Sequence, residues 1–140
     1  AGLFSRRGFN IDSIAVGRTE DSAVSRMTIV LEADQTTGEQ LIKQLNKLVD
    51  TIKVSDVTDD PTVERELALI KVSADSGNRS EILQIVSIFR AKIVDVSERA
   101  AIIEVTGDES KVGALIEMLR PFGIKELVRT GKIALVRTGN

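Results

Sequence analysis

In the second half of the sequence, segments with the hydrophobic pattern of a helix and segments with that of a strand follow one another in a defined order. This order constrains the fold more than any other feature. Apolar residues recur at helical spacing over 78–91 and 108–123, which predicts two amphipathic helices. The β-rich stretches around them span residues 67–74, 92–96, 101–106 and 124–128, with a short one at 133–136. The order strand, helix, strand, strand, helix, strand is that of a ferredoxin-like unit.

The first half of the sequence repeats this order in part. A helix is predicted over 36–50, and residues 1–8 read as the last two turns of an earlier helix. The β-rich stretches lie at 11–16, 27–33 and 51–57. We therefore expect the same unit without its opening strand. That strand belongs in the middle of the sheet, so we also expect the native chain to carry it upstream of Ala1.

These two patterns predict an α+β protein of two ferredoxin-like (βαββαβ) domains. The stretch "DDPTVERE" at 59–66 interrupts the pattern with acids and a proline, and it is the expected linker. The first domain then covers 1–58 and the second covers 67–140. At the helix starts, Asn78 with Glu81 has the spacing of a capping box, and Asp108 is the expected N-cap.

Composition removes several classes of function. The 140 residues carry a net charge of −2 and no cluster of Lys and Arg, so a nucleic-acid or acidic-membrane partner is not expected. No apolar run approaches the length of a membrane span, and no leader precedes the first residues, which favours a cytoplasmic protein. The sequence contains no His and no Cys, so thiolate chemistry and most transition-metal sites are excluded.

An enzyme is consequently disfavoured, although carboxylates, lysines and hydroxyls remain. The sequence nominates no catalytic residue and no metal ligand. The acidic pairs in the expected linker, Asp59 with Asp60 and Glu64 with Glu66, are interpreted as solvated charges. An RNA-binding module of this fold would stack bases on strand aromatics. The four phenylalanines all fall on helices or at helix ends: Phe4, Phe9, Phe89 and Phe122.

Asn10 stands where the expected first helix passes into the strand at 11–16. Its amide offers two donors and an acceptor, and could meet both the ammonium and the carboxylate of a free amino acid. On spacing alone, an asparagine that bonds its own backbone at such a turn is the favoured interpretation. Gly8, Arg6 and Arg7 are interpreted as the end of the helix, with ligand or partner contact as the alternative.

Six blocks of sequence resemble one family in order along nearly the whole chain. They are "GLFSRRGFNIDSIAVG", "SRMTIVLEAD", "QLNKLVDTIKVSDVT", "VERELALIKV", "FRAKIVDVSERAAIIEVTG" and "ELVRTGKIALVR". The family is the small regulatory subunit of acetolactate synthase, also called acetohydroxyacid synthase. The resemblance implies an amino-terminal ACT domain followed by a second ferredoxin-like domain.

The family resemblance also implies a function. A small subunit of this kind has no active site; it binds the catalytic subunit, activates it, and confers feedback inhibition by valine or related branched-chain amino acids. Thiamine diphosphate, magnesium and FAD are implied on the catalytic subunit and no cofactor on this chain. The effector is implied to lie between two ACT domains of a homodimer, with contacts that match Asn10 and Ile11. In a plant or alga the compartment would be the plastid stroma.

Two other readings stay open on the residues alone. A free-standing amino-acid sensor of ACT type is the alternative to the regulatory subunit, and a large catalytic partner that co-purifies would separate the two. The blocks "VERELALIKV" and "RTGKIALVR" favour the subunit, because a bare sensor has no need of a second domain. An enzyme ranks third.

Overall fold

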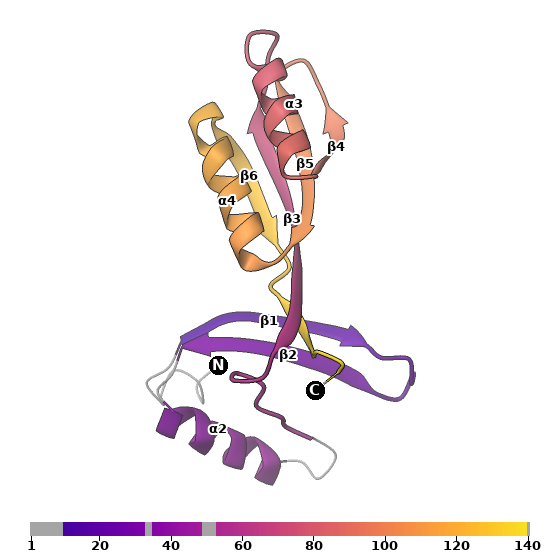
Figure 1. Ribbon diagram of the computed structural model, residues 1–140, viewed down its shortest axis with the longest axis vertical. Coiled ribbons are helices and arrows are strands. Elements are labelled where there is room, and N and C mark those ends of the chain that lie inside the picture. Colours follow the sequence, from indigo (N-terminus) through magenta and orange to yellow (C-terminus); the bar gives the residue numbers. More distant parts are fainter. Residues whose placement is uncertain (1–9, 33–34, 49–52, 140) are drawn as a thin grey trace. The chain divides into compact units, whose positions relative to one another are not determined.

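The computed structural model describes residues 10–32, 35–48 and 53–139 (Figure 1). The chain divides into two compact units, one of residues Ala1–Val63 with Ala134–Asn140 and one of residues Glu64–Ile133. Helices and antiparallel strands make up both, which confirms the predicted α+β class. The units part near the expected linker and place 134–140 with the first unit. The domain boundaries drawn from the sequence stay a prediction.

The second unit has the strand order that the sequence predicts. Its sheet runs β4-β5-β3-β6 with antiparallel neighbours, which is the order of a ferredoxin-like fold. Helices α3 and α4 both lie on one face of this sheet (Figure 1). The elements are β3 (Thr62–Ser73), α3 (Arg79–Ile88), β4 (Lys92–Val96), β5 (Ala100–Gly107), α4 (Glu109–Leu119), a 3₁₀ turn (Arg120–Phe122) and β6 (Ile124–Arg129). A short strand, β7 (Ile133–Val136), also pairs with β3.

The core of the second unit lies between this sheet and the two helices. Alternate residues of β3 and β5 point into it because successive side chains of a strand face opposite sides. The fully buried side chains include Ile70, Val72, Ile103 and Val105 from the strands and Ile82, Val112, Leu115 and Leu119 from the helices. Each contributes roughly 1.5–3 kcal/mol by leaving water. The remaining residues of β3 and β5 face the side of the sheet that carries no helix.

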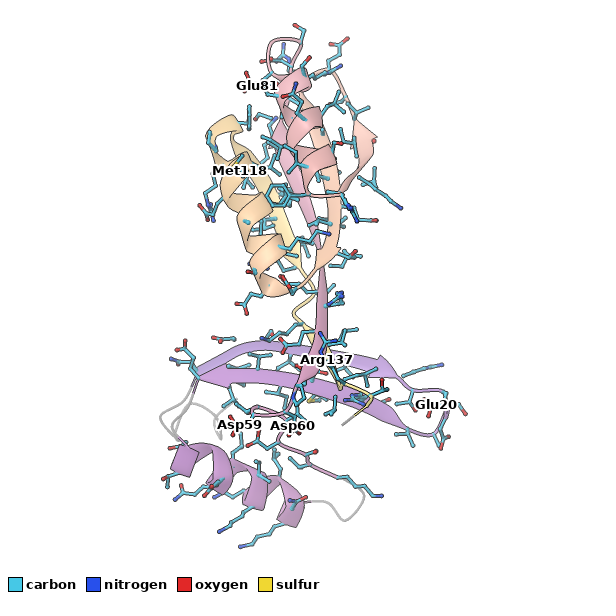
Figure 2. The ribbon with its side chains drawn as sticks, in the orientation of Figure 1. Glu20, Asp59, Asp60, Glu81, Met118 and Arg137 are labelled. Atoms are coloured by element: carbon cyan, nitrogen blue, oxygen red, sulfur yellow. The ribbon has the colours of Figure 1, made fainter. Side chains whose placement is uncertain are left out.

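The first unit contains a β-hairpin and a helix among its described residues. Strands β1 (Asn10–Arg18) and β2 (Ser25–Glu32) pair along their length, and α2 (Gln35–Leu48) follows. The connecting turn is closed by Thr19, whose N–H donates to the carbonyl of Val24 at 3.1 Å. Glu20 lies at the tip of this turn (Figure 2). Leu41 of α2 is buried.

One predicted strand is not present. Residues 53–57 have no strand conformation, while residues 51–52 lie outside the described residues, as does the helix predicted over 1–8. The β-branched residues of this stretch give it strand propensity, but a strand also needs a neighbour to accept its ladder hydrogen bonds. Among the described residues, the only partner of β1 and of β2 is the other strand of the hairpin.

The expected linker is partly strand. β3 begins at Thr62, directly after Pro61, so that Glu64 and Glu66 are ladder positions and not solvated linker residues. Glu66 is buried, with only 8% of its surface exposed. Glu64 forms an ion pair with Lys132 at 3.0 Å, and Glu66 pairs with Arg129. The charges suggested a linker because sequence alone does not show that each carboxylate has a cation beside it.

The two predicted helix caps have different outcomes. Asp108 is the N-cap of α4, where its carboxylate accepts from the N–H of Lys111 at 2.9 Å. The capping box of Asn78 with Glu81 is wrong, since the Asn78 side chain makes no cap hydrogen bond. Its Oδ1 instead accepts from the N–H of Asp75 at 2.8 Å. The Asn78 side chain is therefore bonded to the loop ahead of α3 and not to the first turn of the helix.

Candidate functional site

The β1–β2 hairpin contains a bulge close to the predicted effector residues. Asn10 lies opposite Glu32 and Ile11 opposite Leu31, but from Ser13 onward the register shifts by one residue. Asp12 is therefore an extra residue in β1 that has no partner in β2. Such a bulge bends its strand and redirects the side chains beyond it.

The bulge gathers most of the large apolar residues of the hairpin on one face, whereas the opposite face is mixed. Residues 11 and 14 are three apart, so a regular strand would direct them to opposite sides. The extra residue brings Ile11 onto the face of Ile14, because residues that lie opposite one another in the ladder share a face. The apolar face then consists of Ile11, Ile14 and Val16 from β1 with Met27, Ile29 and Leu31 from β2. Its outer part is exposed, to 63% at Val16 and 56% at Met27.

Asn10 and Ile11 lie side by side at the end of the hairpin, but their side chains point to opposite faces. Asn10 is exposed and shares the mixed face with Glu32, Ser13 and Val30. Ile11 is half-buried on the apolar face. The other candidates, Arg6, Arg7 and Gly8, lie outside the described residues.

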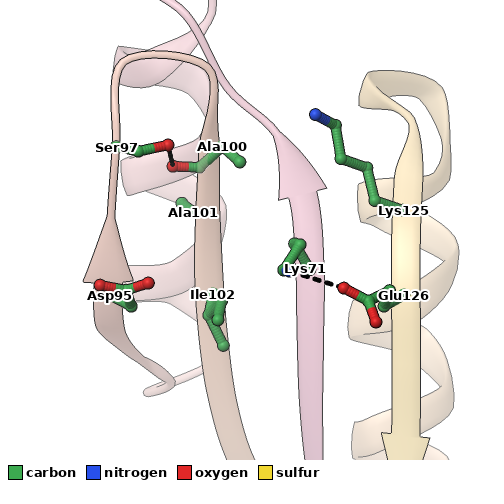
Figure 3. Close-up of a pocket in the computed structure, with 8 residues that line it drawn as sticks. All are labelled: Lys71, Asp95, Ser97, Ala100, Ala101, Ile102, Lys125 and Glu126. Carbon is green, nitrogen blue, oxygen red and sulfur yellow. Dashed lines mark hydrogen bonds and ion pairs between the residues drawn. The ribbon is translucent and has the colours of Figure 1, made fainter.

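A hollow of about 410 Å³ opens on the helix-free face of the second unit's sheet. Figure 3 shows charged side chains from three strands around it: Asp95 of β4, Lys71 of β3, and Lys125 and Glu126 of β6. Ile102 of β5 forms part of its floor. The register places Asp95, Ile102, Lys71 and Glu126 in one row across the four strands.

The middle of this row is neutralised by an ion pair. Lys71 Nζ lies 2.5 Å from Glu126 Oε2. The hydrogen bond between them raises the pKa of Lys71 and lowers the pKa of Glu126, and the negative charge of Asp95 also raises the pKa of Lys71 slightly. Among the described residues, the side chains of Asp95 and Lys125 form no hydrogen bond or ion pair.

Sequence reasoning missed the charged residues of this hollow. Lys71 interrupts the apolar stretch "LALIKVS", and that interruption was the available signal. Nothing in the sequence marks the register shifts in β4 and β6 that accompany the positions of Asp95 and Lys125 around this hollow. The residues Asp59 and Asp60, considered as a possible carboxylate pair, are exposed and belong to the first unit.

The described part of the chain has neither a metal-binding cluster nor a membrane-spanning helix. There, no group of three or more Asp or Glu side chains is placed to hold a metal ion. None of the described helices is both long and apolar enough to cross a membrane.

Family models match both halves of the chain. Residues 65–138 match the model of the small subunit of acetolactate synthase, and residues 1–53 match an AHAS small subunit-like ACT domain. The probable acetolactate synthase small subunit of Archaeoglobus fulgidus is 61% identical over 137 residues, which cover 98% of this chain and 86% of that one. The small subunit of Aquifex aeolicus is 55% identical over 138 residues, covering 98% and 72%.

A solved structure shows the same architecture. The crystal structure of the acetolactate synthase small subunit from Thermotoga maritima superimposes with a TM-score of 0.88 at 48% identity, covering 99% of this chain and 87% of that one. An ACT domain joined to a second ferredoxin-like domain defines a regulatory, non-catalytic subunit of an enzyme complex. The chain belongs to the acetolactate synthase small-subunit family, as the resemblance implied. Membership implies a catalytic subunit as its partner.

Proposed function

We propose that this chain activates the catalytic subunit of acetolactate synthase and makes it sensitive to feedback inhibition by valine or a related branched-chain amino acid. The observation that carries the proposal is the 61% identity to a small subunit over 98% of the chain, which includes both domains. An ACT domain at 1–58 senses the effector, and the domain at 67–140 completes the subunit.

The effector site is proposed at Asn10 and Ile11. Asn10 is exposed at the first pair of the β1–β2 ladder, so its amide is free of packing constraints and can meet a charged head group. Ile11 contributes its main chain there, since its side chain faces the other side of the hairpin. Among the described residues β1 pairs only with β2, and we propose that the ACT domain of a second copy supplies the other half of the site.

Valine acts on this arrangement by differential affinity. An effector shifts an equilibrium between a less active and a more active assembly only if it binds one of them more tightly. A coupling of about 1–3 kcal/mol between effector and catalytic subunit corresponds to roughly 5- to 150-fold in apparent affinity. The same coupling requires that the catalytic subunit weakens or strengthens valine binding by an equal factor.

The cofactors and the cellular compartment are properties of the whole enzyme complex. We propose that thiamine diphosphate, magnesium and FAD are held by the catalytic subunit and that this chain carries no cofactor. The cytoplasm is the proposed compartment, supported by bacterial and archaeal relatives. The plastid stroma would replace it if the chain came from a plant or alga.

Acetolactate formation by the cognate catalytic subunit tests the proposal directly. The rate is measured with and without this chain, each across a valine titration. We expect the chain to raise the rate and valine to suppress the increase. A rate that responds neither to the chain nor to valine would reject the regulatory role and leave a free-standing amino-acid sensor as the function to test.

A further inference from the structure

The hollow on the helix-free face of the second unit's sheet has a small apolar floor between charged sides. Ile102 and Ala100 of β5 form this floor, and both are partly shielded from solvent. The register sets Ile102 between Asp95 of β4 on one side and Lys71 of β3 on the other. Lys125 of β6 also lines the hollow, and its side chain leans from β6 toward β3 (Figure 3).

The four charges that line the hollow sum to zero, but only two of them are paired. Lys71 and Glu126 form the ion pair described above. Among the described residues, the Asp95 carboxylate and the Lys125 ammonium have no hydrogen bond or ion pair. These two groups come from strands β4 and β6, with the floor and the ion pair between them. One free negative group and one free positive group therefore remain on opposite sides of the same hollow.

A ligand with a single charge fits this arrangement poorly. An anion such as phosphate is attracted by Lys125 but repelled by Asp95, and a cation meets the reverse. Among the described residues, no group of three or more Asp or Glu side chains is placed to hold a metal ion. A molecule with one ammonium and one carboxylate satisfies both free groups through charge-assisted hydrogen bonds, which are shorter and stronger than neutral ones. The charges of the hollow therefore favour a zwitterion.

The dimensions of the hollow suit a small zwitterion. Its volume of about 410 Å³ lies within the range of small-molecule sites, roughly 300–1,000 Å³. Asp95 and Lys71 are two strand spacings apart, about 10 Å between their backbones. Lys125 starts one strand further away, and its flexible four-carbon stem lets the ammonium approach the floor. A free α-amino acid carries both charged groups on one carbon atom, so its side chain can lie on Ile102 and Ala100, which favours an apolar side chain.

We propose that this hollow binds a free α-amino acid with a small apolar side chain, at a site separate from the effector site at Asn10. Asp95 accepts hydrogen bonds from the ammonium of the ligand, Lys125 donates to its carboxylate, and its side chain lies on Ile102. These three residues belong to the second unit, whereas Asn10 belongs to the first. Because the hollow is open to solvent, water screens its charges, and we expect a weak site with a dissociation constant in the millimolar range.

NMR titrations of the full chain, followed at individual backbone amides, test this site and separate it from the first unit. L-Valine is compared with isovalerate, which lacks the ammonium, and with isobutylamine, which lacks the carboxylate. We expect L-valine to shift the amide signals of Asp95, Ile102 and Lys125 along one saturating curve. Each analogue loses one hydrogen-bonded charge, so it should bind at least about tenfold more weakly at these signals. Equal affinities for L-valine and either analogue would overturn the proposal.

Asp95→Asn and Lys125→Gln each remove one charge and keep the shape of the side chain. Each should weaken L-valine binding at the second-unit signals by at least about tenfold, while the first-unit signals keep their wild-type titration. Glu81→Gln on α3, in the helix layer (Figure 2), is the matched control and should leave every curve unchanged. The spectra themselves show whether each variant is folded. Wild-type affinity in both variants would overturn the proposal. So would L-valine shifts confined to the first unit, which would leave the effector site at Asn10 standing.

Discussion

Arg129 of β6 reaches back along the sheet to Glu66 of β3, and its Nε donates to Glu66 Oε1 at 2.9 Å. Its Nη2 donates to the same oxygen. The Glu66 side chain is only 6% exposed, and the Arg129 side chain is 35% exposed. The sequence placed Glu66 in a solvated linker, but the structure places it, buried and paired with Arg129, on a strand that leads directly into the core.

Removal of the arginine should destabilise the second unit strongly. Arg129→Met leaves the Glu66 carboxylate buried without its cation, and the loss of one partner of a buried pair costs about 3–5 kcal/mol. Because Arg129 is one-third exposed, we expect a value toward the lower end. Urea unfolding measures the change in the free energy of unfolding.

The double variant Glu66→Leu with Arg129→Met is the control for this prediction. It removes the charge together with its partner, so it should recover most of the lost stability. A single substitution that costs less than about 0.5 kcal/mol would show that the pair behaves as an ordinary surface ion pair.

Helices and strands whose apolar residues recur with a clear periodicity were predictable from the sequence. Strand β4 at Lys92–Val96 and strand β7 at Ile133–Val136 have the predicted bounds. Alternation or apolar character alone indicates these strands, and the turn residues beside them mark their ends. The strand order of the second unit followed from the sequence of elements, because few topologies accommodate it.

Features that depend on a partner residue were not predictable. The bulge at Asp12, the cation beside Glu66 and the absence of a strand at 53–57 are all set by which segment pairs with which. Local propensity carries no such information. The candidate site was predictable to the extent that Asn10 lies exposed at a strand end. The opposite orientation of Ile11 was not.

Arg90 offers a second stability test. It follows α3 with a φ of 54°, a left-handed conformation that costs a non-glycine residue roughly 1 kcal/mol. The N–H groups of Arg90 and Ala91 donate to the carbonyls of Ser87 and Val86, which is the hydrogen-bond pattern of a Schellman motif. Arg90→Gly should therefore raise the free energy of unfolding by about 0.5–1 kcal/mol.

Arg90→Ala separates backbone strain from the loss of the arginine side chain. It removes the same side chain but keeps the Cβ that makes this conformation unfavourable. We therefore expect no rise in the midpoint temperature of thermal unfolding. Equal stabilisation by alanine and glycine would mean that the guanidinium, and not the backbone, is the unfavourable element.

Lys132 should contribute stability that disappears in alkali. Its hydrogen bond to Glu64, followed by the charges of Glu64 and Glu109, raises the pKa of Lys132 above 10.5 despite partial burial. A group with a raised folded-state pKa stabilises the protein fully below its unfolded-state pKa, and this contribution is lost as pH rises through the folded-state pKa. The contribution is at most about 1 kcal/mol, because the site is partly solvated.

The comparison of wild type with Lys132→Met from pH 7 to 12 measures this contribution. The difference in the free energy of unfolding should be constant near neutrality and shrink above pH 10.5. A difference that stays constant to pH 12 would assign the effect of the substitution to packing of the lysine stem.

Asn10→Ala should separate inhibition from activation. The substitution removes an amide that is proposed to contact the charged head group of valine, and a hydrogen bond to a charged group contributes about 1.5–3 kcal/mol. We therefore expect the half-inhibitory valine concentration to rise by roughly 10- to 100-fold. Activation of the catalytic subunit should remain close to wild type, because Asn10 is exposed and carries no packing role. Ser13→Ala, on the same face but beyond the bulge, should leave both properties unchanged. Loss of activation with preserved valine sensitivity would reject the assignment of Asn10 and place it in the contact with the catalytic subunit.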